Sequence, residues 1–148
     1  MAELLRAAAA APALELPRLW EALVFNWLIG NCDAHAKNFS LLYDAGAPTL
    51  APLYDLVSTT VYPELTTRLA MRIAGAITIG SVTAEAWEQL AGEVGVRRQF
   101  ALRTLASLAE RVSNAIADVV GRPEHDDEIV ERIAWPIRRR LDAALSSR

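Results

Sequence analysis

The sequence is poor in cysteine and histidine: its 148 residues include one cysteine, Cys32, and two histidines. A single cysteine excludes an intramolecular disulfide, and a closed zinc site needs four ligands. Sparse cysteine is typical of a reducing compartment, so we expect a cytoplasmic protein. Cys32 is expected to be a small packing residue rather than a nucleophile.

Long apolar runs and an excess of positive charge are also missing. No apolar stretch approaches the ~20 residues of a membrane-spanning helix, and the alanine run at 7–11 lacks the pattern of a signal peptide. The net charge is -3 and the sequence pI is about 5.4, whereas a nucleic-acid binder normally presents a basic face. We therefore expect neither membrane insertion nor direct nucleic-acid binding, and interpret Arg138, Arg139 and Arg140 as a solvated helix end.

Apolar residues make up 53% of the chain and charged residues 22%, which indicates a folded domain, expected over residues 1–148. Apolar residues recur at helical spacing in several segments. We predict helices at 2–11, from Pro17 to Gly30, from Thr83 to about Glu93, at 96–120, and from Asp126 to Leu145. Pro136 should kink or split the last of these.

The apolar stripes of these helices predict the core. The buried face of the long helix is expected to include Leu105, Leu108, Val112, Ile116 and Val119, and that of the last helix Ile129, Ile133, Ile137, Leu141 and Leu145. The four tryptophans, Trp20, Trp27, Trp87 and Trp135, should fill the core or the face toward a missing lobe.

A small β element is expected between the second and third helices. Residues 39–43 and 50–54 read as two strands joined by a turn at 44–48, with Pro52 confining the second strand to an edge. Residues 69–73 form an apolar run of uncertain type. The predicted fold is therefore mainly α with a small β-hairpin.

The loop that follows the second helix concentrates polar side chains. Asp33, His35, Lys37 and Asn38 lie within six positions between two apolar segments. Asp33 and Asn38 have the D-x-x-x-x-N spacing of a kinase catalytic loop, in which the Asp accepts a proton from the substrate hydroxyl and the Asn reaches Mg²⁺. Lys37 can neutralise charge on the phosphoryl group. A solvated loop without catalytic function is the plain alternative.

A second carboxylate is needed to hold Mg²⁺ against the phosphates of ATP. Asp55 is the candidate, because chain reversal near Gly46 would bring it back beside Asn38. We expect the Asp55 carboxylate and the Asn38 amide to face one pocket, with Asp33 on its other side.

Together, residues 30–40 (GNCDAHAKNFS) and 51–59 (APLYDLVST) closely resemble the HipA family. These are bacterial serine/threonine protein kinases that act as toxins in toxin–antitoxin pairs. The resemblance covers roughly residues 16–120. It implies the mainly helical C-terminal lobe of a two-lobed kinase.

The resemblance also implies residue roles. Asp33 matches the catalytic base, and Asn38 and Asp55 match the Mg²⁺ ligands. His35, Ala36, Lys37, Asn38, Tyr54 and Asp55 match positions around the nucleotide. The implied cofactors are ATP and Mg²⁺, the substrate is a protein, and the partner is a HipB-like antitoxin that contacts operator DNA.

One kinase part is missing from the sequence. A Gly-rich phosphate loop and a strand lysine belong to an N-terminal lobe, yet of the seven glycines only Gly30 precedes Asp33. We therefore expect the N-terminal lobe to be absent and this chain alone to be inactive. It could be a piece of a longer protein, half of a split kinase, or a remnant.

Two other functions stay open. A non-catalytic binding module would dock an antitoxin or an N-lobe subunit, and a phosphotransferase would act on small hydroxylated molecules. In any of these cases the apolar residues 1–16 are expected to cover the surface near the Asp33 loop, or to pair with a second copy as a homo-oligomer.

Overall fold

The computed structural model describes residues 1–148 except 44–45, 121, 123 and 147–148, and the side chains of 143, 145 and 146 are likewise outside the description. The described part is mostly helical with two small antiparallel hairpins. Its helices are α1 (Ala2–Ala8), α2 (Pro12–Ile29), α3 (Ala84–Val94), α4 (Arg98–Val119) and α5 (Asp127–Ser146), and its strands are β1 (Leu41–Leu42), β2 (Thr49–Leu50), β3 (Arg68–Ile73) and β4 (Ala76–Thr78). Short 3₁₀ helices are η1 (Ala36–Asn38), η2 (Thr59–Val61) and η3 (Ile79–Ser81).

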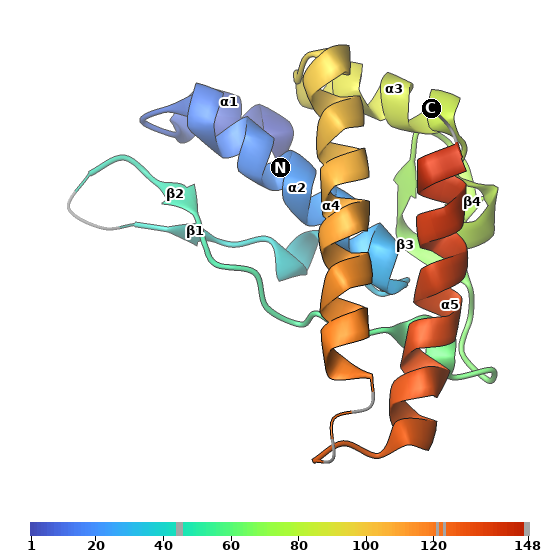
Figure 1. Cartoon of the computed structure of the whole chain (residues 1–148). Helices are drawn as coiled ribbons and strands as arrows, with labels where there is room; N and C mark the ends of the chain where they lie inside the picture. Colours follow the sequence, from blue (N-terminus) through green and yellow to red (C-terminus); the bar gives the residue numbers. More distant parts are fainter. Residues whose placement is uncertain (44–45, 121, 123, 147–148) are drawn as a thin grey trace.

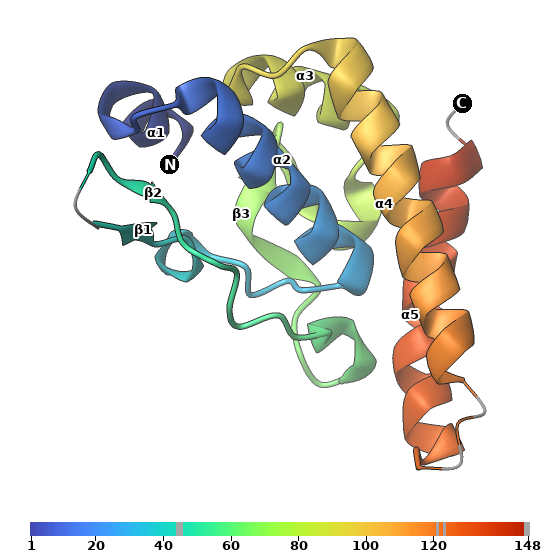
Figure 2. The same cartoon turned by 60° about the vertical axis from the view of Figure 1, so that its left-hand side comes forward.

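The long helices α4 and α5 run side by side, and the β1–β2 hairpin extends on the side of α4 opposite to α5 (Figure 1). A second view places α1 and the start of α2 at the same end of the molecule as this hairpin (Figure 2). Among the described residues, no helix combines the length and the apolar character needed to cross a membrane.

Helix α2 begins at Pro12, so the predicted start at Pro17 is wrong. Proline suits the first helical position because its missing N–H has no partner there in any helix. Pro17 lies inside the helix instead. The turn before it stays helical because Glu15 and Leu16 are buried against the rest of the fold. The predicted first helix likewise ends early, at Ala8, and Ala9 is extended.

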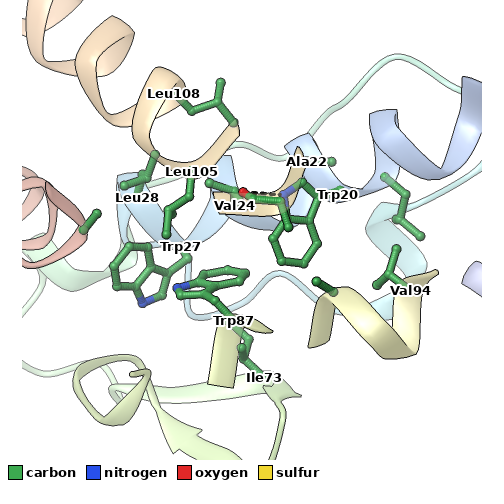
Figure 3. Packing of buried hydrophobic residues seen from close by; sticks show 14 of the residues in the cluster. Trp20, Ala22, Val24, Trp27, Leu28, Ile73, Trp87, Val94, Leu105 and Leu108 are labelled. Carbon is green, nitrogen blue, oxygen red and sulfur yellow. Dashed lines mark hydrogen bonds between the residues drawn. The ribbon is translucent and has the colours of Figure 1, made fainter. Parts of the chain in front are cut away.

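Three tryptophans form the centre of the core (Figure 3). Trp20 and Trp27 from α2 each meet Trp87 of α3 edge-to-face, with ring centroids 5.4 Å apart. The indole N–H of Trp20 donates to the carbonyl of Ala101, and that of Trp27 donates to the carbonyl of Ile79. These contacts join α2, α3 and α4 and agree with the predicted core positions.

Trp135 does not belong to this core, because 61% of it is exposed. Its ring lies on α5 under the guanidinium of Arg139, whose carbon is 5.3 Å from the ring centroid. An indole paired with a cation at the surface keeps a favourable contact without burial. Of the two places predicted for the tryptophans, the core is therefore excluded for Trp135, and the face toward a missing lobe stays a prediction for it.

The stripe predicted for α4 is confirmed at Leu105 and Leu108, which are buried, and Val112 and Ile116 pack against the core. On α5, Ile137 and Leu141 are buried, but Ile129 and Ile133 are exposed, so the predicted stripe is wrong at its start. The first turns of α5 lie beside the end of α4 only, beyond the other elements (Figure 1). The helix continues through Pro136 and is not split there, and the side chain of Leu145 is outside the described residues.

The first hairpin is shorter than predicted, with Leu41 opposite Leu50 and Leu42 opposite Thr49. The predicted strand at 50–54 is wrong beyond Leu50, because Pro52 cannot donate to a ladder and Asp55 has a left-handed φ of 57°. Its predicted turn includes two residues outside the described part. The uncertain run at 69–73 belongs to β3, which pairs with β4 as a second hairpin.

The N-terminal residues pack on the fold close to the polar loop. Leu5 is fully buried, and the Arg6 guanidinium donates to the carbonyl of Glu93 at the end of α3. Met1 and Ala2 line a cavity of about 190 Å³ that also touches Cys32. This arrangement agrees with the expectation that residues 1–16 cover the surface near that loop.

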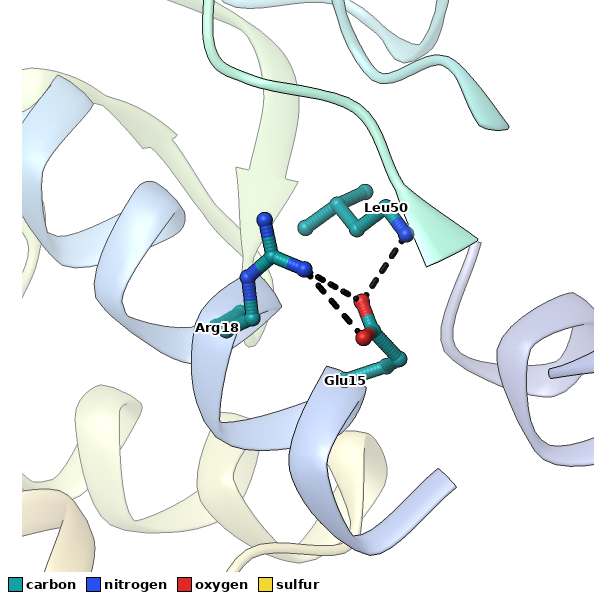
Figure 4. Close-up of polar contacts among 3 residues, drawn as sticks. All are labelled: Glu15, Arg18 and Leu50. Carbon is teal, nitrogen blue, oxygen red and sulfur yellow. Dashed lines mark hydrogen bonds and ion pairs between the residues drawn. The ribbon is translucent and has the colours of Figure 1, made fainter. Parts of the chain in front are cut away.

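Glu15 fastens the hairpin to α2 (Figure 4). Its buried carboxylate accepts a hydrogen bond from the backbone N–H of Leu50 at 2.8 Å and forms an ion pair with Arg18 at 3.1 Å. The end of β2, five residues before Asp55, is thereby held against the helix.

Removing this anchor should destabilise the chain. Glu15→Ala leaves the Leu50 N–H buried without an acceptor, which costs about 1–3 kcal/mol of unfolding free energy. Glu21→Ala, on an exposed position of the same helix, is the matched control. Urea unfolding measures both, and equal effects of the two substitutions would show that the carboxylate does not anchor β2.

Candidate active site

The polar loop begins where α2 ends, at Gly30. This residue has φ of 82°, in the left-handed region that glycine adopts without a steric penalty. A Cβ here would lie 2.2 Å from Oγ1 of Thr60 and 2.3 Å from Nη2 of Arg140. Glycine is therefore required both by the backbone conformation and by the close approach of two other segments.

Asp33, Lys37 and Asn38 occupy different environments within the loop. Asp33 and Lys37 are exposed, whereas Asn38 is buried at the end of η1. The backbone N–H of Asn38 donates to the carbonyl of His35 at 3.0 Å, which closes the 3₁₀ turn. The loop thus presents the Asp33 carboxylate to solvent and turns the Asn38 amide inward.

Asn38 and Asp55 are in direct contact, although 17 residues separate them. Nδ2 of Asn38 donates to Oδ2 of Asp55 at 2.7 Å. Asp55 is exposed and follows the hairpin with a left-handed backbone. Non-glycine residues rarely adopt this conformation and often do so at functional sites. The structure therefore brings these two candidate residues together, as chain reversal required.

Tyr54 contacts the end of the loop, at Lys37 and Ser40. Its hydroxyl donates to the carbonyl of Lys37 and lies 2.7 Å from Oγ of Ser40. Ala36 is exposed at the start of η1, and His35 is half-buried with Nδ1 enclosed and lacking a hydrogen-bond partner. Tyr54 thus joins the segment of Asp55 to that of Asn38 at a second point.

The cavity noted above lies beside this loop and is lined by Cys32, Ala34 and Ala36, mostly with apolar atoms. Asp33, Asn38 and Asp55 are not among its lining residues. The contact of Asn38 with Asp55 therefore lies apart from this apolar cavity, at a surface where both acids are exposed.

The oxygen atoms of Asn38 and Asp55 suit Mg²⁺ better than they suit a metal that is enclosed entirely by protein ligands. In the described ranges, no cluster of three or more His, Cys, Asp or Glu side chains could enclose an ion. Mg²⁺ is usually bound by one or two carboxylates together with waters and substrate phosphates. The Asp55 carboxylate and the amide oxygen of Asn38 fit such an incomplete site, because the Asn38 amide bonds Asp55 through its nitrogen.

Arg140 is a residue near the loop to which the sequence pattern gave no role. Its Nε donates to the carbonyl of Leu28 at 3.0 Å, at the C-terminal end of α2. Burial lowers the pKa of the Arg140 guanidinium to about 10, so it stays charged at neutral pH. The interpretation of residues 138–140 as a solvated helix end is thus wrong for Arg140, which links α5 to the start of the loop.

Cys32 is buried, with 4% of its surface exposed, and its backbone N–H donates to Oγ1 of Thr59. Burial raises the pKa of the Cys32 thiol, and the nearby Thr59 hydroxyl and Arg140 oppose this rise. A nucleophilic cysteine would need a lowered pKa and access to solvent. These features agree with a packing role.

The Cys32 thiol should accordingly resist alkylation. In the native chain we expect iodoacetamide to react much more slowly than in the urea-unfolded chain. The pH midpoint of the reaction should lie above that of the unfolded chain, because the folded environment disfavours the thiolate. Mass spectrometry of timed samples across pH measures both. A native midpoint equal to or below the unfolded one would contradict the burial argument.

Comparison with known proteins shows which family this chain matches. Residues 1–116 match the HipA-like C-terminal domain. A putative kinase of Sinorhizobium fredii, Y4mE, is 43% identical over 118 residues, which cover 80% of this chain and 28% of that protein. The serine/threonine-protein kinase toxin HipA of Shewanella oneidensis is 34% identical over 97 residues, covering 66% of this chain and 22% of the toxin.

The fold is similar to that of a solved HipA structure. The match is to the Shewanella oneidensis complex of HipA, HipB and operator DNA, with a TM-score of 0.77, 28% sequence identity, and coverage of 90% of this chain and 32% of that chain. The chain thus spans about a third or less of the length of these relatives. By the extent of the match and the agreement in fold, the chain belongs to the family of HipA-like C-terminal domains.

Proposed function

We propose that this chain is the C-terminal catalytic lobe of a HipA-like serine/threonine protein kinase, which transfers the γ-phosphoryl group of Mg-ATP to a protein hydroxyl. The observation that supports this most strongly is the 2.7 Å contact of Asn38 with Asp55, since Asn38 lies on the same loop as Asp33. Kinase sites place an Asp and an Asn of the catalytic loop beside a second Asp in this way. The named kinases among the relatives add support.

In this proposal, the chain's own residues bind and position the reactants. Oδ1 of Asn38 and the carboxylate of Asp55 hold Mg²⁺, which when bound neutralises charge on the β- and γ-phosphates. Asp33 orients the substrate hydroxyl and accepts its proton, for which an exposed carboxylate at the loop surface is accessible. Lys37 adds positive charge beside the transferred group.

The remaining candidate residues form the border of the nucleotide site. His35 is the residue before η1 and Ala36 is its first residue, and the hydroxyl of Tyr54 fixes the backbone at Lys37. We assign these three residues to the surroundings of the ATP phosphates. Their part is to fix the loop conformation that the phosphates meet, since positioning supplies much of the rate of a kinase.

The partners are proposals too, because the relatives are several times longer than the match. We infer that a further lobe, fused or separate, completes the ATP site, and that the 148 residues alone bind Mg-ATP weakly without turnover. A HipB-like antitoxin is the proposed regulator in a bacterial cytoplasm. With a net charge of -3, this chain is less suited than such a partner to contact DNA.

A binding module without catalysis is the second candidate, and one observation favours it. The segment after Asp55 exposes several large apolar side chains, namely Leu56, Val57, Tyr62 and Leu65. Such a surface suits contact with another polypeptide. A lobe that only docks a partner could use this surface, and so could an active kinase. Two copies of the chain could also associate through it.

Phosphoryl transfer separates these functions. The chain is incubated with Mg²⁺ and γ-³²P-labelled ATP, alone and with an N-terminal HipA-like lobe added as a separate polypeptide. We expect no labelling of protein serine or threonine by the chain alone, and labelling by the combination that Asp33→Asn removes. Binding of the added lobe without any transfer would favour the docking module. Transfer only to small hydroxylated compounds would favour the phosphotransferase.

A further inference from the structure

The side chain of Asn31 lies behind the loop and contacts both segments that carry the candidate acids. Only 2% of Asn31 is exposed. Its Oδ1 accepts a hydrogen bond from the backbone N–H of Asp33 at 3.1 Å, and its Nδ2 donates to the backbone carbonyl of Asp55 at 2.9 Å. One buried amide therefore bridges two residues that are 22 positions apart in the sequence.

The orientation of this amide is fixed by its partners. Nδ2 of Asn31 also donates to Oδ1 of Asn26 at 2.8 Å, and Nδ2 of Asn26 donates in turn to the carbonyl of Ala22 inside α2. A flipped Asn31 amide would set its nitrogen against the Asp33 N–H and its oxygen against the Asp55 carbonyl. Donor would then face donor and acceptor would face acceptor, so only one orientation satisfies all three partners of the Asn31 amide.

The bridge matters most at Asp55, whose φ of 57° is unfavourable for a residue with a side chain. Such a conformation persists only when surrounding contacts determine it. Two contacts do so here: Nδ2 of Asn31 holds the Asp55 carbonyl, and Nδ2 of Asn38 holds its carboxylate.

We propose that Asn31 is a positioning residue, whose amide sets the placement of Asp55 relative to Asp33. This inference rests on the proposed function. Asn31 is buried and bonds the backbone of both acids, so its role is to act through them. No other side chain of this length offers one acceptor and two donors from a single planar group. An aspartate keeps the acceptor for Asp33 but loses both donors.

The test uses Mn²⁺ as a probe for the proposed Mg²⁺ site. Water-proton relaxation measures the affinity of the 148-residue chain for Mn²⁺ at saturating ATP. Asn31→Ala and Asn31→Asp should weaken Mn²⁺ binding about 10–100-fold, the effect typical of groups that orient metal ligands. The matched control is Thr59→Val. Thr59 accepts from the Cys32 N–H and donates to the Gly30 carbonyl, so Val removes two hydrogen bonds at the same loop without touching Asp33 or Asp55.

A merely structural Asn31 would lower stability without changing metal affinity at temperatures where each variant is folded. Equal Mn²⁺ affinity of the Asn31 variants and wild type would overturn the inference while leaving the proposed function intact. Absence of Mn²⁺ binding by wild type would overturn the inference, and the proposed function would fall with it if the chain completed by an N-terminal lobe also failed to transfer phosphate. Should the variants fail to fold, amide hydrogen exchange of the wild-type chain decides. The backbone N–H of Asp33 must exchange slowly, because it donates to Asn31. Exchange at the rate of an unfolded peptide would reject the bridge between Asp33 and Asp55.

Discussion

Asp33→Asn is expected to lower the rate of phosphoryl transfer about 10²–10⁴-fold, the contribution typical of a general base. The assay uses the kinase that forms when this chain is completed by an N-terminal lobe. Asparagine has the shape of aspartate but cannot accept a proton from the substrate hydroxyl. The Asp33 backbone N–H still has Asn31 as its acceptor, so the loop conformation should persist.

The informative contrast is with Asp55→Asn. Asp33→Asn should keep Mn²⁺ affinity close to wild type, because the contact between Asn38 and Asp55 does not involve Asp33. Asp55→Asn should lose both metal affinity and transfer. If Asp33→Asn abolished Mn²⁺ binding, Asp33 would be a metal ligand instead of a base. Unchanged transfer in this variant would remove it from the mechanism.

Trp87→Ala should cause the largest loss of stability, about 3–5 kcal/mol of unfolding free energy, as for other buried aromatic side chains. Trp87 is 2% exposed and meets both Trp20 and Trp27 edge-to-face. Its truncation leaves a cavity where α2, α3 and α4 meet. Urea denaturation followed by circular dichroism measures the change.

Two variants control for this effect. Trp87→Phe should cost clearly less, because the indole N–H of Trp87 is buried without a partner and phenylalanine loses no hydrogen bond. Trp135→Ala should change stability little, because Trp135 is 61% exposed. If Trp135→Ala were as costly as Trp87→Ala, the position of the core would have to be reconsidered.

The local part of the candidate site could be predicted from the sequence. The spacing of Asp33 and Asn38 lies within one loop, and a single chain reversal returns Asp55 beside Asn38. The supporting contacts could not be predicted in this way. Glu15 reaches Leu50 across 35 residues, and Arg140 reaches Leu28 across 112. No periodicity in a sequence encodes such pairs, because they depend on how finished elements pack.

The fold shows the same division between local and distant information. Helical spacing predicted α3, α4 and the second half of α5, and Oγ1 of Thr83 accepts from the Ala86 N–H as a helix cap should. Two features depend instead on tertiary contacts: the exposure of the first turns of α5, and the part of α2 that precedes Pro17. The β3–β4 hairpin turns at Ala74 and Gly75, both with positive φ, and alanine gives little signal for such a turn.

Paramagnetic broadening by Mn²⁺ tests most directly whether Asn38 and Asp55 form the cation site of a kinase lobe. Mn²⁺ is added with ATP to the ¹⁵N-labelled chain, and the amide signals are followed by NMR. We predict broadening that is strongest at the Asn38 side chain and the Asp55 backbone and is lost in Asp55→Asn. Broadening that spares these two residues and centres instead on the acidic start of α5, at Asp127 and Glu128, would contradict the proposed site.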